Sequence, residues 1–122
     1  MTTLLSNLAV TLALAGAPQA QWVVVNPSGN RQLAEAAVQL LAKAQPRLEQ
    51  ITGLKLLGRA TLVLCATTAD FRRATPGIDH RHTLGVAYPM QKTIYLNCEE
   101  IAQRPFASLA TTLRHELCHL LV

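Results

Sequence analysis

Two histidines and a glutamate near the end of the sequence could do chemistry together. The stretch LRHELCHLLV holds His115, Glu116 and His119 in the pattern H-E-x-x-H. Residues four apart on a helix place their Cβ atoms about 5–6 Å apart on one face. Two imidazoles at that spacing can bind one zinc ion through bonds of about 2.0–2.1 Å, and a carboxylate beside them can take a proton from water that the metal activates. The pattern therefore predicts metal-assisted hydrolysis.

The helix that must hold these residues is predicted to run from about Phe106 to the end of the chain. At 100° per residue its leucines fall within an arc of roughly 120°, and the two histidines lie on nearly the opposite side. The leucines of this arc are Leu109, Leu113, Leu117, Leu120 and Leu121. We expect them to pack on a core while the histidine pair faces a cleft. The alternative is a histidine pair on a merely solvated helix face.

The elements that must support this helix follow from alternating strand and helix patterns. Strands are predicted at 22–25, 61–65, 84–88 and 93–96, with 89–92 as a hairpin loop between the last two. The uninterrupted apolar run at 61–65 predicts a strand buried on both faces. Short helical segments are predicted from Asp70 to Ala74 and after Asn97. These alternations predict an α/β fold with a mixed sheet and helices packed on it.

A long helix is predicted between Asn30, which can cap it, and Gly53, which ends it. Pro46 is expected to kink or split this helix near Gln45. The apolar residues at helical spacing, which predict its buried face, are Leu33, Ala37, Leu40, Leu41, Ala44, Leu48 and Ile51.

The first 20 residues are predicted to be a signal peptide, which leaves 21–122 as the folded domain. Residues 4–20 are apolar or small, carry no charge and end in alanine-rich A-x-A sites, although no Lys or Arg precedes them. The location expected is secreted or periplasmic, or anchored by an uncleaved leader, with no other membrane span. The alternative is a buried N-terminal helix.

Composition argues against nucleic acid as a partner. The net charge is +4, but the basic residues are scattered and aromatic residues make up only 4%. Binders of single-stranded nucleic acid need aromatic platforms among their basic residues. The expected partner is instead a peptide or protein substrate.

The three cysteines leave two states open. Cys65 and Cys98 lie near the ends of predicted strands and could pair after export, which would leave Cys118 free. Three unpaired, largely buried thiols are the other possibility, because a free cysteine behaves as a small apolar residue.

The chain resembles the N-terminal half of a zincin metallopeptidase domain of the gluzincin, peptidase MA-like type. The resemblance is carried by the strand TLVLCAT, the segments ADFRRA, GVAYP and TIYLN, and above all the helix TLRHELCHLLV. It implies that His115 and His119 bind Zn²⁺ and that Glu116 is the general base. It also implies that Gly85, Val86 and Ala87 form a strand at the cleft rim, against which an extended peptide lies.

One part of that resemblance is missing from the chain. In gluzincins a glutamate from a second helix, downstream of the motif, is the third zinc ligand, and catalytic zinc sites use three protein ligands and a water. Within the chain, His80 or His82 could swing toward the metal, whereas Cys118 projects away from the pair. We therefore expect a piece of a longer protein, with little hydrolysis by the 122 residues alone.

Three functions remain open at this point. The first is a zinc metallopeptidase, complete only with further sequence. The second is a non-catalytic secreted module that binds peptides or partners on a zincin-like scaffold. The third is a small exported domain in which the histidine pair is incidental.

Overall fold

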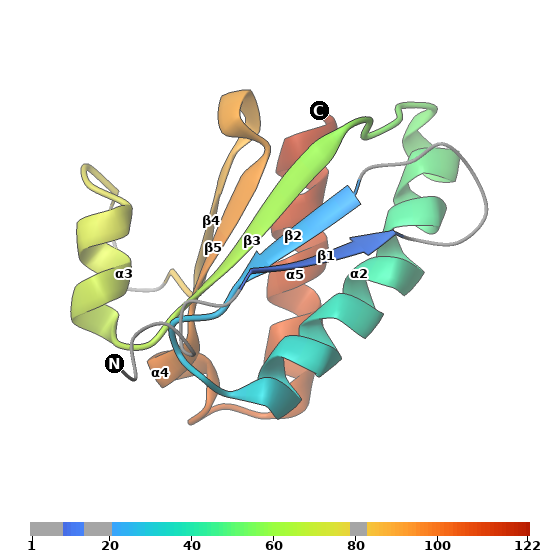
Figure 1. Cartoon of the computed structure of the whole chain (residues 1–122). Coiled ribbons are helices and arrows are strands. Elements are labelled where there is room, and N and C mark those ends of the chain that lie inside the picture. The colour runs from blue at the N-terminus through green and yellow to red at the C-terminus, as the bar shows by residue number, and fades with distance from the viewer. Residues whose placement is uncertain (1–8, 14–20, 79–82) are drawn as a thin grey trace.

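One mixed sheet organises the chain in the computed structural model, which describes residues 9–13, 21–78 and 83–122 (Figure 1). The strand order is β1-β2-β3-β5-β4. Strands β2, β3 and β5 are parallel, while β1 and β4 are antiparallel to their neighbours. The strands are β1 (Ala9–Ala13), β2 (Gln21–Val25), β3 (Arg59–Cys65), β4 (Gly85–Tyr88) and β5 (Thr93–Asn97). The predicted α/β fold class is confirmed.

The helices cover the two faces of this sheet unequally. Helices α2 (Arg31–Thr52) and α5 (Phe106–Leu121) pack together on one face, and the short α3 (Thr68–Ala74) lies at one end of the other (Figure 1). Helix α4 (Cys98–Ile101) follows β5 directly and begins at Asn97, whose side chain accepts a hydrogen bond from the Glu100 N–H. The site described below therefore rests on the face that carries α5.

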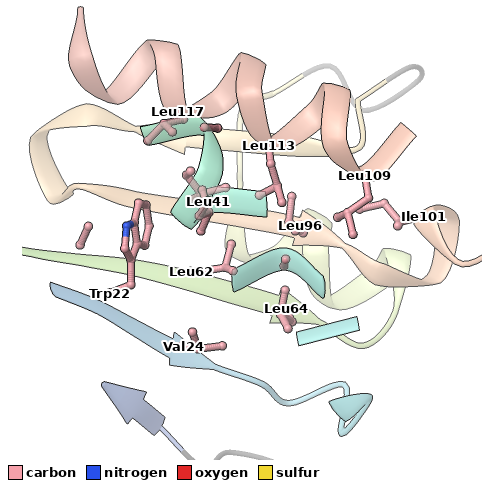
Figure 2. Close-up of a cluster of buried hydrophobic side chains, with 14 of the residues drawn as sticks. Trp22, Val24, Leu41, Leu62, Leu64, Leu96, Ile101, Leu109, Leu113 and Leu117 are labelled. Atoms are coloured by element: carbon pink, nitrogen blue, oxygen red, sulfur yellow. The ribbon is translucent and has the colours of Figure 1, made fainter. Parts of the chain in front are cut away.

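The leucines of α5 form the part of the main core that lies beneath this helix. Leu109, Leu113 and Leu117 are at most 1% exposed and point onto β3 and β5 (Figure 2). Burying one leucine contributes about 1.5–3 kcal/mol, so this row fixes the rotation of α5 about its axis. The predicted core face of the helix is confirmed, with Leu120 half-buried at its border.

Helix α2 begins and ends where the sequence predicts. The Asn30 side chain accepts a hydrogen bond from the Leu33 N–H, and Gly53 closes the helix in the left-handed conformation at φ 73°. The predicted split at Pro46 is wrong, because the helix runs unbroken through it. Proline deprives the carbonyl four residues earlier of its donor, and here both Pro46 and Ala42 are exposed, so water can satisfy that carbonyl.

The end of α2 buries polar side chains rather than the predicted Ile51. Ile51 is 69% exposed, whereas Gln45 and Glu49 are buried. The Trp22 Nε1–H donates to Gln45 Oε1 at 2.9 Å, and Gln45 Nε2 donates to Glu49 Oε2 at 3.3 Å. The same Glu49 oxygen accepts from the Leu56 N–H at 2.8 Å. These bonds tie the strand, the helix and the segment after it together, and Ile51 lies outside this buried polar network.

Strand β3 is buried on one face only, so the prediction of burial on both faces is corrected. Ala60, Leu62 and Leu64 point into the core, while Thr61 and Val63 are half-buried. The reason is that α3 is short and covers only part of the opposite face.

The N-terminal prediction falls largely outside the described residues. Residues 1–8 and 14–20 of the predicted signal peptide are not described, and Ala9–Ala13 forms a strand beside β2 rather than a helix. Within the described ranges, no helix has both the length and the apolarity that a bilayer span requires.

All three cysteines are free thiols, and two of them are buried. Burial raises the pKa of Cys65 to about 11 and that of Cys98 to about 12. Both thiols therefore stay protonated at neutral pH and pack as small apolar side chains.

Candidate metal centre and active site

The two histidines of α5 converge on one point outside the helix. His115 and His119 are exposed, and their Nε2 atoms lie 3.1 Å apart. The rings meet edge to face, with centroids 4.7 Å apart and planes 82° apart. The buried leucines on the other side of α5 fix the rotation that turns the pair outward.

The distance between the two nitrogens fits a shared metal ion. Two nitrogens bound to one tetrahedral zinc at about 2.0–2.1 Å lie about 3.3 Å from each other, close to the 3.1 Å found here. Without a metal, the same distance suits a hydrogen bond from one ring to the other. His115 and His119 could thus hold a divalent ion with little change of rotamer.

Glu116 lies beside the pair but is withdrawn from solvent. It is 7% exposed, and burial raises the pKa of its carboxyl group, while the nearby His115 and a hydrogen bond from the Ala87 N–H act in the opposite direction. A carboxylate whose pKa is raised toward neutrality is a better proton acceptor than an exposed one. The arrangement suits a general base next to a metal.

Strand β4 supplies the second wall and lies at the edge of the described sheet. The Asn97 N–H donates to the Leu84 carbonyl, and the register pairs Val86 with Tyr95. Because hydrogen-bonded and non-bonded pairs alternate in an antiparallel ladder, the N–H and C=O groups of Gly85 and Ala87 point to the open edge.

The three residues predicted at the cleft rim thus lie on different faces of the sheet. Gly85 and Ala87 face α5, whereas Val86 is buried on the opposite face of the sheet in a cluster with Cys65 and Phe71. The backbone groups of Val86 are directed at β5, so only its two neighbours can offer theirs to an extended ligand.

A cleft of about 530 Å³ lies between α5 and β4. It contains all six of the predicted site residues and further residues that the sequence analysis did not identify. Thr111 and Thr112 precede His115 and Glu116 by one helical turn, so helical periodicity could have identified them. Its lining consists of Ile78, Thr83, Leu84, Gly85, Val86, Ala87, Pro89, Thr111, Thr112, His115, Glu116 and His119.

A third protein ligand is not found in the described part of the chain. No cluster of three or more His, Cys, Asp or Glu side chains suited to a metal occurs within residues 9–13, 21–78 and 83–122. The candidates His80 and His82 lie outside the described residues, and Cys118 is half-buried on α5.

Comparison with known proteins adds no relative. No family model matches the chain, and neither a curated protein nor a solved structure matches it. The case for a function therefore rests on the geometry of this cleft.

Proposed function

We propose that the protein is a zinc-dependent peptidase of the zincin type whose active site lies between α5 and β4. The observation that carries the proposal is the convergence of the His115 and His119 Nε2 atoms, 3.1 Å apart, next to the buried Glu116 in an open cleft. An incidental pair of histidines does not need a cleft, a withdrawn carboxylate and a free strand edge at the same place.

Each group has a separate role in this proposal. His115 and His119 hold the ion, which when bound supplies a Lewis acid that polarises the substrate carbonyl and lowers the pKa of water. Glu116 takes the proton from the attacking water and delivers it to the leaving amine. The apolar rows behind α5 keep these side chains in place, so little reorganisation is needed during the reaction.

The open edge of β4 is suited to an extended peptide. A peptide strand added there would pair with the outward backbone groups of Gly85 and with the Ala87 carbonyl, and this pairing would bring its backbone past Glu116. Main-chain recognition of this kind accepts many sequences, and the side pockets of the cleft would then select among them.

The proposal requires a third metal donor from outside the described residues. Two imidazoles alone bind zinc weakly, and catalytic sites use three protein ligands. The gluzincin resemblance assigns that role to a glutamate on a helix downstream of the motif.

Hydrolysis of a casein or fluorogenic peptide library by the whole gene product, including any sequence encoded after Val122, tests the proposal. We expect one zinc per chain and activity that a chelator removes and zinc restores. A zinc-loaded, folded protein that cleaves no peptide would contradict the proposal. Chain 1–122 is the matched comparison, with little activity expected.

The second candidate is a non-catalytic module that binds an extended peptide at the same edge. It is favoured by one observation, the lack of a three-residue metal cluster within the described ranges. Peptide binding that is unaffected by a chelator and by Glu116→Gln, with no turnover, would support this alternative.

A further inference from the structure

Gly85 lies where β4 packs against α5. A Cβ at this position would lie 2.9 Å from Thr112 Cγ2, 3.0 Å from Leu96 Cδ2 and 3.3 Å from Glu116 Cγ. Contacts below 3.0 Å require a neighbour to move. By contrast, a Cβ added at Gly29, which lies in a turn, would meet nothing within 4 Å.

The backbone conformation does not explain this glycine. The four glycines with positive φ are Gly29, Gly53, Gly58 and Gly77, and Gly85 is not among them. An alanine could adopt the backbone conformation found at Gly85. What the position requires is therefore space, and the space is occupied by two residues of α5 and one of β5.

The close approach brings a backbone donor to Glu116. Ala87 lies two residues along β4, on the same face of the strand as Gly85, and its N–H donates to the Glu116 carboxylate. Ordinarily an N–H at the edge of a sheet is available to an added strand. Here the general base of the proposed function already holds one of those donors.

We infer that Gly85 is a positioning residue, which by lacking a side chain lets β4 approach α5 so closely that the Ala87 N–H orients the Glu116 carboxylate in the cleft. The inference rests on the proposed function for its catalytic consequence, but the contact itself does not depend on a metal.

The contact also defines what an added peptide can use. The Gly85 N–H, the Gly85 carbonyl and the Ala87 carbonyl point to the open edge, whereas the Ala87 N–H is engaged by Glu116. A bound peptide could therefore donate an N–H to the Ala87 carbonyl, but the Ala87 N–H could not donate to a carbonyl of the peptide. The peptide carbonyl opposite Ala87 would then make no hydrogen bond to β4, so a Lewis acid or a water could reach it.

Gly85→Ala is the direct test, and Thr112→Ser supplies its rescue. The added methyl should push β4 from α5 and weaken the Ala87–Glu116 bond. The double variant, which removes Thr112 Cγ2, should restore it, and Thr112→Ser alone should resemble the wild type. The readout is the amide proton of Ala87 in an NMR spectrum of the metal-free chain, because an amide bonded to a carboxylate resonates downfield and exchanges slowly.

We expect the Ala87 amide to move upfield and to exchange faster in Gly85→Ala, and to return toward the wild-type position in the double variant. Glu116→Gln should also move it upfield. An Ala87 amide that is unchanged in either Gly85→Ala or Glu116→Gln would overturn the inference. Should Gly85→Ala fail to fold, the response to Glu116→Gln decides, because that variant removes the charge without adding volume.

In the active whole protein, a misplaced base should lower kcat by up to about 10²-fold with little change in KM or in zinc affinity. Loss of zinc affinity with an unchanged kcat would contradict a positioning role. The two proposals fail separately: a protein that binds no zinc refutes the proposed function, while the Ala87 amide still reports whether Gly85 positions Glu116.

Discussion

Two glutamates are buried in this protein to nearly the same extent, yet their surroundings differ. Glu49 is 9% exposed and Glu116 is 7% exposed. Glu49 accepts hydrogen bonds from the Leu56 N–H and from Gln45, which is itself bonded to Trp22. Glu116 receives a single backbone N–H from β4 and faces a cleft with two imidazoles beside it.

The difference shows why burial alone does not identify a chemical group. Buried carboxylates must be compensated, and around Glu49 the compensation comes from three segments that it joins, which is a structural role. Around Glu116 the compensation is partial and one side is left open to a ligand. A substitution at each glutamate should therefore change a different property of the protein.

The largest effect is expected for Glu116→Gln. It removes the proposed proton acceptor but keeps the shape of the side chain and an oxygen for the Ala87 N–H, so the rate of the proposed hydrolysis by the whole protein should fall by about 10²–10⁴-fold. Zinc stoichiometry, measured by atomic absorption, should be unchanged. An unaltered rate would show that Glu116 is not the base and would remove the distinction between the two glutamates.

The next largest effect is expected for Glu49→Ala, and on stability instead. The variant leaves the Leu56 N–H and the Gln45 amide without their acceptor, and hydrogen bonds to charged groups contribute about 1.5–3 kcal/mol each. We expect the free energy of unfolding in urea to fall by about 2–3 kcal/mol, with the zinc affinity of the histidine pair unchanged. The control is Glu49→Gln, which retains an acceptor and should cost less than half as much.

A stability loss that is equal for Glu49→Ala and Glu49→Gln would mean that the hydrogen bonds around Glu49 contribute little. A change in zinc affinity would mean that the two regions are coupled, contrary to the comparison.

The structural parts of this comparison were only partly predictable from the sequence. The caps of α2 at Asn30 and Gly53 are local signals, and the leucine row of α5 is periodic, so the sequence predicts both. It does not predict the burial of Gln45 and Glu49, because that burial depends on Trp22, 23 residues away from Gln45. Periodicity alone places Ile51 in the core, because it does not include those polar contacts.

The candidate site, too, could be predicted only in part from the sequence. The spacing of His115 and His119 is enough to predict that their rings can meet. The space at Gly85 and the bond from Ala87 to Glu116 depend on the register of β4 against β5 and on its distance from α5, and neither can be read from residue types. The unbroken path of α2 through Pro46 likewise depends on which side of the helix faces water.

A smaller effect is expected for Trp22→Phe, which tests the far end of the network around Glu49. The variant removes the Nε1–H that bonds Gln45 Oε1 at 2.9 Å and leaves a buried acceptor unsatisfied. The cost should be about 1–2 kcal/mol in the free energy of unfolding. Near additivity of Trp22→Phe and Glu49→Ala in a double variant would show that the bonds act independently, whereas a network predicts a combined loss smaller than the sum.

The effect expected from the buried thiols is absent at neutral pH, where it is the smallest of these, and it appears only under alkaline conditions. The pKa values of Cys65 and Cys98 are raised to about 11 and about 12 in the folded protein. Above about pH 9 the unfolded chain loses these protons while the folded chain keeps them, so the stability that they contribute is present below pH 9 and is lost as pH rises.

We expect stability to fall by up to about 1.4 kcal/mol per pH unit for each thiol above pH 9. In Cys98→Ala the slope measured by urea unfolding between pH 9 and 10.5 should be shallower. An identical slope in the variant would show that Cys98 is not protected from ionisation.

The central claim, that one turn of α5 directs two imidazoles at a common ion, is tested most directly by titrating Zn²⁺ into the ¹⁵N-labelled chain and following the histidine ring nitrogens by NMR. The account predicts that the Nε2 resonances of His115 and His119 shift together with one shared affinity. It also predicts that His115→Ala or His119→Ala weakens binding, whereas Cys118→Ser does not. Zinc binding that leaves both Nε2 resonances in place, or that persists unchanged when both histidines are replaced, would contradict the account.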